Sequence, residues 1–236
     1  ALESPLHVVP GNHDIGDKDN PTVPSHTVNE DFIQYFKEHY GPTYQSFDHK
    51  NIHFIILNTP VLNSGLAEEK QQRNWLEKDL EANHGKRIHI FSHYPPYLHT
   101  PDEPDNYDNL DQPARAWLLE LLEKHNVEAY YAGHIHQYFH KRHLNTDIIN
   151  LLATGNLRQD YATMFRTSPA EEYGRNDPPK LGYCLVDIYQ DTHVTHIKRS
   201  YGETSKPPIQ RAIDTHYPNP STHMPLGIEL RYPLAE

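Results

Sequence analysis

Three short apolar segments of this chain each end in a block that contains histidine, and no other feature constrains the fold as strongly. Leu6–Val9 is followed by Gly11-Asn12-His13-Asp14, Arg87–Phe91 by Ser92-His93, and Glu128–Ala132 by Gly133-His134-Ile135-His136. Short apolar runs that stop at glycine or polar residues are typical of buried strands. Since ligand sites of open α/β sheets lie at the carboxyl ends of strands, we expect the three blocks to meet at one edge of a sheet.

The side chains at these three strand ends are nitrogen and oxygen donors, namely Asn12, His13, His93, His134 and His136. Imidazole is the commonest metal ligand in proteins, and a donor set without thiolates suits zinc, manganese or iron. An isolated histidine is usually hydrogen-bonded or on the surface, and we assign that role to most of the 19 histidines. Three such blocks in order along the chain instead predict a metal site.

The remaining pattern predicts an α/β domain with mixed sheets, because strands alternate with helices early in the chain and pair as hairpins late. Helices are expected over 28–39, 67–83 and 112–125, and strands over 44–48, 52–58, 137–143, 147–153, 181–189 and 192–199. Residues 202–236 are rich in proline and weakly periodic. We therefore expect one domain over residues 1–200 and a C-terminal arm or linker over residues 201–236.

Charge and composition exclude several classes of protein. The net charge of −11 argues against binding to nucleic acid, which takes positively charged partners. No run approaches the roughly 20 apolar residues of a membrane-spanning helix, so no membrane partner is expected. The single cysteine, Cys184, excludes an internal disulfide and a cysteine-based zinc site. The chain begins Ala-Leu-Glu and reads as a piece of a longer protein, so the compartment stays open between cytoplasmic and secreted.

In their order along the chain, the three histidine blocks resemble the third, fourth and fifth signature blocks of the calcineurin-like metallophosphoesterase superfamily. The resemblance covers residues of about 5–200, and serine/threonine-phosphatase or cyclic-nucleotide-phosphodiesterase-like members look most similar. It implies a four-layer α/β/β/α sandwich of two mixed sheets. It also implies an enzyme that hydrolyses a phosphomonoester or phosphodiester with water activated at a two-metal site.

The resemblance further implies a role for each site residue. Four side chains are implied as ligands of two divalent ions (manganese, iron or zinc): Asn12, His93 and His134 on one ion, and His136 on the other. His13 is implied as the catalytic histidine, which protonates the leaving oxygen or stabilises charge on the phosphoryl group. Asp14 is implied to orient His13 without binding metal.

The chain departs from the family pattern at its beginning. The first two signature blocks, Asp-x-His and Gly-Asp-x-x-Asp, would precede residue 11, where only ten residues stand. We therefore expect the N-terminal part of the domain, with the remaining metal ligands, to lie upstream. Three segments imitate these blocks: Asp191-Thr192-His193, Asp214-Thr215-His216 and Gly16-Asp17-Lys18-Asp19. Turn chemistry explains them better than a rearranged site.

Two segments are candidates for contact with a small phosphate ester. The acidic segment Asp102–Asp108 is expected near the site edge, either as a solvated loop or as a segment that shapes the substrate mouth or repels polyanions. Arg158 follows a glycine-containing turn and could bind a phosphate oxygen or simply pair with Asp160. Two alternatives remain: a metal-dependent nuclease of the same superfamily, against which the net charge counts, and a catalytically inactive scaffold, against which the intact histidines count.

Overall fold

The computed structural model describes residues 4–20, 26–155 and 181–199 of the 236-residue chain. These residues divide into two compact units. The first comprises the described residues up to His134 together with His140–Ile149, and the second comprises Ile135–Phe139 with the described residues from Asn150 onward. Arg158 and the 201–236 arm lie outside the described residues, so the predicted boundary near residue 200 stays a prediction.

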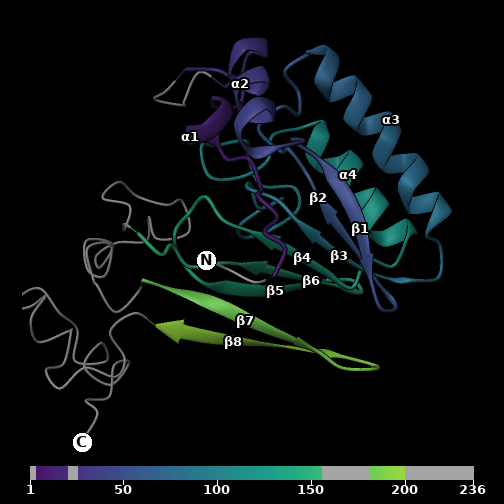
Figure 1. The fold of residues 1–236 in the computed structure, drawn as a ribbon. Coiled ribbons are helices and arrows are strands. Elements are labelled where there is room, and N and C mark those ends of the chain that lie inside the picture. Colours follow the sequence, from purple (N-terminus) through teal and green to yellow (C-terminus); the bar gives the residue numbers. More distant parts are fainter. Residues whose placement is uncertain (1–3, 21–25, 156–180, 200–236) are drawn as a thin grey trace, which may run out of the picture. The chain divides into compact units, whose positions relative to one another are not determined.

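A six-stranded mixed sheet forms the framework of the first unit, with the strand order β1-β2-β3-β4-β6-β5 (Figure 1). The strands are β1 (Gln45–His49), β2 (Ile52–Ile56), β3 (Arg87–Phe91), β4 (Ala129–Ala132), β5 (Phe139–His143) and β6 (Thr146–Asn150). The predicted strands β1 and β2 form an antiparallel hairpin, whereas β2, β3 and β4 run parallel. The predicted α/β fold class is confirmed.

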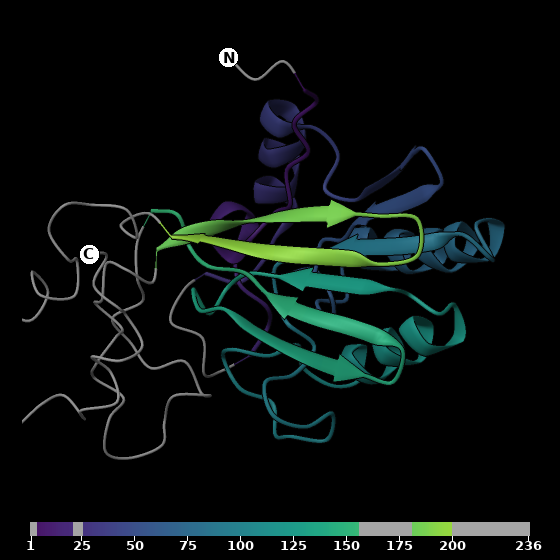
Figure 2. The ribbon, with the colours of Figure 1, turned by 90° about the horizontal axis from the view of Figure 1, so that it is seen from below.

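Helices α3 (Ala67–Ala82) and α4 (Ala114–Lys124) cover one face of this sheet, close to their predicted ranges (Figures 1 and 2). Each places leucines at helical spacing in the core, all of them fully buried: Leu76, Leu80, Leu118 and Leu122. The two helices are the crossovers that parallel neighbours require, α3 between β2 and β3 and α4 between β3 and β4. The carboxyl ends of β3 and β4 therefore lie at the same edge of the sheet.

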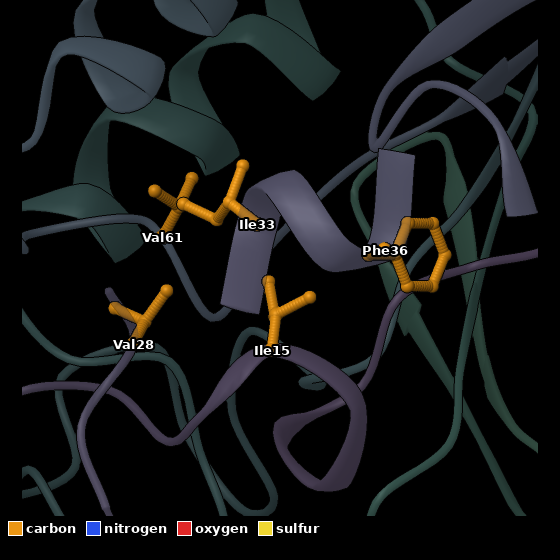
Figure 3. Packing of buried hydrophobic residues seen from close by; sticks show 5 residues of the cluster. All are labelled: Ile15, Val28, Ile33, Phe36 and Val61. Atoms are coloured by element: carbon orange, nitrogen blue, oxygen red, sulfur yellow. The ribbon is translucent and has the colours of Figure 1, made fainter. Parts of the chain in front are cut away.

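Helices α1 (Asn12–Ile15) and α2 (Glu30–Tyr40) pack together through an apolar cluster (Figure 3). Its members are at most 7% exposed: Ile15, Val28, Ile33, Phe36 and Val61. Ile15 comes from α1, and Val61 comes from the segment after β2. The cluster therefore holds the Gly-Asn-His-Asp block beside the carboxyl end of β2.

Helix α2 begins two residues later than the predicted Val28 because Asn29 caps it. The Asn29 side chain accepts a hydrogen bond from the backbone N–H of Phe32 at 3.0 Å, and asparagine is among the preferred residues at this position. The helix ends at Tyr40, one residue beyond the predicted range, and Gly41 follows it with a φ of 96° that favours glycine.

The predicted strand at Leu6–Val9 is wrong, because this segment forms no regular structure. Among the described residues, no strand of the sheet pairs with it, and an apolar run alone does not supply the hydrogen-bonding partner that a strand needs. The segment is held to the rest of the protein by side-chain contacts. His7 stacks on Phe47 with ring centroids 3.9 Å apart, and Val8 packs against the apolar cluster.

The second unit contains the predicted antiparallel hairpin of β7 (Gly182–Ile188) and β8 (His193–Arg199). Asp191 and Thr192 lie in its turn, which agrees with their assignment to turn chemistry. No helix in the ranges that the structure describes combines the length and apolar character needed to cross a membrane.

Candidate metal centre

Three of the predicted ligands meet in the first unit. Asn12 Oδ1 lies 2.7 Å from His93 Nε2, and His134 Nδ1 lies 3.2 Å from the same nitrogen. Asn12 and His134 are buried and His93 is half-buried. Asn12 begins α1, His93 follows β3 and His134 follows β4. We call this group of Asn12, His93 and His134 the three-donor site.

Backbone pairing continues beyond the ends of β3 and β4 and brings His93 and His134 together. The N–H of Ser92 donates to the carbonyl of Tyr131 at 2.9 Å, and the N–H of Gly133 donates to the carbonyl of His93 at 2.9 Å. The buried hydroxyl of Thr59 accepts from the N–H of His93 at 3.2 Å. The loop after β3 is therefore fixed on both sides, and a fixed loop holds its ligand ready for a metal.

The spacing and chemistry of the three-donor site fit a divalent cation. Ligand atoms about 2.0–2.2 Å from one ion lie roughly 3 Å apart. The separations of 2.7 Å and 3.2 Å around His93 Nε2 match that value. One oxygen and two imidazole nitrogens without thiolate suit manganese, iron or zinc.

Hydrogen bonds from neighbouring groups fix which atom of each ligand faces the site. The amide nitrogen of Asn12 donates to Asp17 Oδ2 at 3.0 Å and to the Tyr107 hydroxyl at 3.2 Å, so its oxygen is left for His93. His134 Nε2 lies 3.0 Å from the carbonyl oxygen of Tyr107. Because a carbonyl only accepts, Nε2 carries the hydrogen and Nδ1 keeps its lone pair for a metal.

The block after β4 adopts an uncommon backbone conformation. His134 and His136 have φ values of 63° and 59°, in the left-handed region that residues other than glycine seldom occupy. Strained backbone of this kind concentrates at functional sites. His136 belongs to the second unit, and its role on a second ion stays a prediction.

His13 and Asp14 lie on α1, directly after Asn12, and both side chains are exposed. Asp14 Oδ2 accepts from the backbone N–H of Gly11 at 2.8 Å and thereby caps the short helix. The catalytic role of His13 and its orientation by Asp14 stay predictions.

Gly11 leaves room for His93. A Cβ at this position would lie 2.9 Å from both Cε1 and Nδ1 of the His93 ring, closer than carbon atoms normally approach. A Cβ on Gly133 would meet the same ring at 3.8 Å, an ordinary contact. The φ of Gly11 is −109°, which alanine adopts freely, so a substitution there adds no backbone strain to the collision with His93 and the tighter 3.3 Å approach to Asp14 Oδ2.

Replacing Gly11 by alanine is expected to weaken zinc binding by about tenfold or more, because the displaced imidazole loses its alignment with Asn12. Gly133→Ala is the matched control and is expected to leave zinc affinity unchanged. Competition with a chromophoric chelator measures both. Equal affinities in the two variants would show that the Gly11–His93 contact does not shape the site.

Asp17 and Lys18 are buried polar neighbours of the site whose long-range contacts the sequence did not reveal. Asp17 is fully buried and accepts from Asn12 and from the Tyr94 hydroxyl. Lys18 is 2% exposed and pairs with Asp111 at 2.8 Å. Burial lowers the pKa of the Lys18 ammonium, and the Asp111 carboxylate opposes that shift. Tyr94 and Asp111 lie 77 and 93 residues further along the chain, so no local pattern marks these pairs.

The acidic segment Asp102–Asp108 is anchored to the protein, which favours a place at the site over a merely solvated loop, and its contact with a substrate stays a prediction. The fully buried Arg115 donates to the carbonyl of Leu110 at 2.7 Å and to the Asp105 carboxylate at 2.7 Å. Asp108 is fully buried, with Oδ1 3.9 Å from His134 Nε2. The segment therefore forms one wall of the three-donor site.

Glu103 stabilises the start of this segment and gives it a predictable pH dependence. Burial raises the pKa of Glu103, but hydrogen bonds from the Asn109 side chain and from the N–H groups of Leu98, His99 and Thr100 outweigh it and lower the pKa overall. A carboxyl whose pKa is lower in the folded state stabilises that state above its unfolded pKa. This contribution is lost as the pH falls through the lower, folded value.

Glu103→Gln is therefore expected to reduce the free energy of unfolding at pH 7 by roughly 1 kcal/mol, since solvent screens a partly exposed group. The difference from the unmodified protein should shrink at about pH 3, below the ordinary pKa of a glutamate. Urea unfolding at both pH values measures it. Glu120→Gln, an exposed position on α4, is the control. A deficit that is equal at both pH values would contradict the account.

The model of the family described as calcineurin-like phosphoesterase matches residues 1–138, more than half of the chain. The serine/threonine-protein phosphatase CPPED1 of Danio rerio is 30% identical over 157 residues, which cover 64% of this chain and 48% of that protein. This chain thus spans about half the length of that relative.

Two further matches cover more of this chain. The probable glycerophosphodiester phosphodiesterase GpdQ of Arcobacter nitrofigilis is 28% identical over 209 residues, which cover 85% of this chain and 70% of that protein. The solved structure of purple acid phosphatase PPD1 from Lupinus luteus seeds matches with a TM-score of 0.55 and 15% identity, over 81% of this chain and 38% of that one. At that identity, the structural match supports the fold alone.

Proposed function

Because the chain belongs to the calcineurin-like phosphoesterase family, we propose that it forms part of a metal-dependent hydrolase of phosphate esters. The observation that carries this proposal is the convergence of Asn12 Oδ1, His93 Nε2 and His134 Nδ1 from three separate segments. The relatives named as phosphatase and as phosphodiesterase support a monoester or a diester as substrate.

The proposed roles follow the chemistry of the side chains. Asn12, His93 and His134 hold one divalent ion, and His136 contributes to a second. Two such ions, when bound, supply an activated water and neutralise charge on the phosphoryl oxygens. His13 donates a proton to the leaving oxygen, a task that suits an imidazole near neutral pH.

Chelation and reconstitution test this function. The protein, in its full-length form, is stripped with EDTA, supplied with Mn²⁺, Fe²⁺ or Zn²⁺, and assayed with p-nitrophenyl phosphate and bis(p-nitrophenyl) phosphate. We expect hydrolysis of at least one ester only after an ion is restored, and the ratio of the two rates assigns monoester or diester specificity. Failure with every ion would overturn the proposal in favour of a non-catalytic binding domain.

Competition by DNA distinguishes a small-ester hydrolase from a nuclease. The net charge of −11 and the acidic wall at Asp102–Asp108 repel a polyanion. We expect an excess of double-stranded DNA to leave hydrolysis of the small ester unchanged. Inhibition by DNA, together with its cleavage, would instead favour the nuclease.

A further inference from the structure

Lys18 is a buried cation whose whole bonding capacity is directed at one loop. Its ammonium donates to the carbonyl of Asn106 at 2.6 Å, to the carbonyl of Asn109, and to Asp111 Oδ1 at 2.8 Å. An ammonium has three hydrogens, so these three acceptors use all of them. Burying a lysine is costly unless it is paired in this way.

The two carbonyls that Lys18 holds belong to Asn106 and Asn109, which flank Tyr107 and Asp108. The turn is tightened from within, because the N–H of Asp108 donates to Asn106 Oδ1 at 2.9 Å and the N–H of Asn106 donates to Asn109 Oδ1 at 3.1 Å. Lys18 therefore fixes the position of the Tyr107 backbone relative to the segment that follows α1.

Tyr107 in turn contacts two members of the three-donor site. Its carbonyl accepts from His134 Nε2 at 3.0 Å, and its hydroxyl lies 3.2 Å from Asn12 Nδ2. The carbonyl determines which ring nitrogen of His134 carries the hydrogen, and hence which nitrogen presents its lone pair to the site. A displaced Tyr107 would release the His134 ring and would remove one of the two acceptors of the Asn12 amide, leaving Asp17 Oδ2 as the other.

We propose that Lys18 is a positioning residue for metal binding, which holds the Asn106–Asn109 turn so that the Tyr107 carbonyl keeps His134 in the Nε2–H form with Nδ1 toward the site. This inference rests on the proposed function, but it concerns a residue outside the ligand set. The ammonium acts through the backbone of the turn and touches none of the three donor atoms.

The first test reads the tautomer of His134 in protein stripped of metal. In protein labelled with ¹⁵N-histidine, long-range ¹H–¹⁵N correlation spectra distinguish a protonated Nε2 from a protonated Nδ1, and His134→Gln assigns the signals. We expect the Nε2–H form in the unmodified protein and a mixture of forms in Lys18→Met. Lys37→Met is the control, because it removes a lysine that pairs with Glu68 at 2.7 Å on helices away from the turn.

The second test measures Zn²⁺ affinity by calorimetry in the same proteins. Lys18→Met is expected to bind Zn²⁺ at least about tenfold more weakly, the usual cost of losing the group that orients a metal-ligating histidine. Lys37→Met is expected to keep its affinity. An unchanged tautomer together with an affinity within about twofold of the unmodified protein would overturn the proposal.

A double variant keeps the test decisive where Lys18→Met folds poorly. Lys18→Met with Asp111→Leu replaces the buried ion pair by apolar side chains, an exchange that is often neutral or stabilising. Since it still lacks donors for the two carbonyls, we expect its Zn²⁺ affinity to stay low. Recovery of both affinity and tautomer would show that Lys18 contributes stability alone.

The tautomer measurement also separates this inference from the proposed function. It needs neither a bound ion nor hydrolysis, so a protein that proves inactive on every ester still decides the role of Lys18. Conversely, the protein could be active while His134 has the same tautomer in the unmodified protein and in Lys18→Met. That result would leave the hydrolase proposal intact and refute the positioning role.

Discussion

Replacing His134 by alanine is expected to weaken zinc binding at the three-donor site by at least about 100-fold and to abolish hydrolysis with it. The change removes one of the three converging donor atoms, and losing even the hydrogen-bond partner of a ligand costs about 10- to 100-fold. Chelator competition gives the affinity, and release of p-nitrophenol gives the rate. Both quantities should fall together, because the rate depends on the ion.

His125→Ala is the matched control for this result. His125 is buried like His134, but it follows α4 and precedes β4, so it lies at the opposite edge of the sheet. Its removal is expected to lower the free energy of unfolding and to leave zinc affinity unchanged. If His134→Ala bound zinc as tightly as His125→Ala, His134 would not be a ligand.

His13→Ala is expected to behave differently, with a kcat reduced by about 10²- to 10⁴-fold and zinc affinity preserved, because a general acid acts on the substrate without holding the ion. The loss should depend on the leaving group. Alkyl phosphates need a proton at the leaving oxygen far more than p-nitrophenyl phosphate does. The ratio of the two rates therefore reports directly on proton donation.

The control is His39→Ala, which removes an exposed histidine from α2. It is expected to leave both rates unchanged. A His13→Ala protein that hydrolyses both esters normally would remove His13 from the mechanism. A rate loss that is equal for good and poor leaving groups would assign it to phosphoryl charge stabilisation in place of proton donation.

Local patterns were sufficient to predict most elements of the first unit. The apolar run that forms β3 and the leucine spacing of α4 are each contained in a short stretch of sequence. The structure places both elements close to their predicted ranges. The prediction of a strand at Leu6–Val9 was wrong because strand pairing depends on two segments, and the sequence of one segment alone does not reveal its partner. Similarly, the start of α2 depends on a single capping bond from Asn29.

The candidate ligands were predicted from motifs, whereas the groups that orient them were not. Asn12, His93 and His134 stand in recognisable blocks. Asp17 and Lys18 directly follow Gly16 and resemble turn residues, because the partners that make their burial tolerable lie in the distant segments containing Tyr94 and Asp111. Long-range polar pairs of this kind become visible only once the chain is folded.

The most direct test of the metal centre is anomalous diffraction from crystals of the protein soaked in Zn²⁺. We expect an anomalous peak about 2.0–2.2 Å from Asn12 Oδ1, His93 Nε2 and His134 Nδ1, with His134 Nε2 still hydrogen-bonded to the carbonyl of Tyr107. Zinc bound only elsewhere, or a His134 ring that presents Nε2 to the ion, would contradict this expectation.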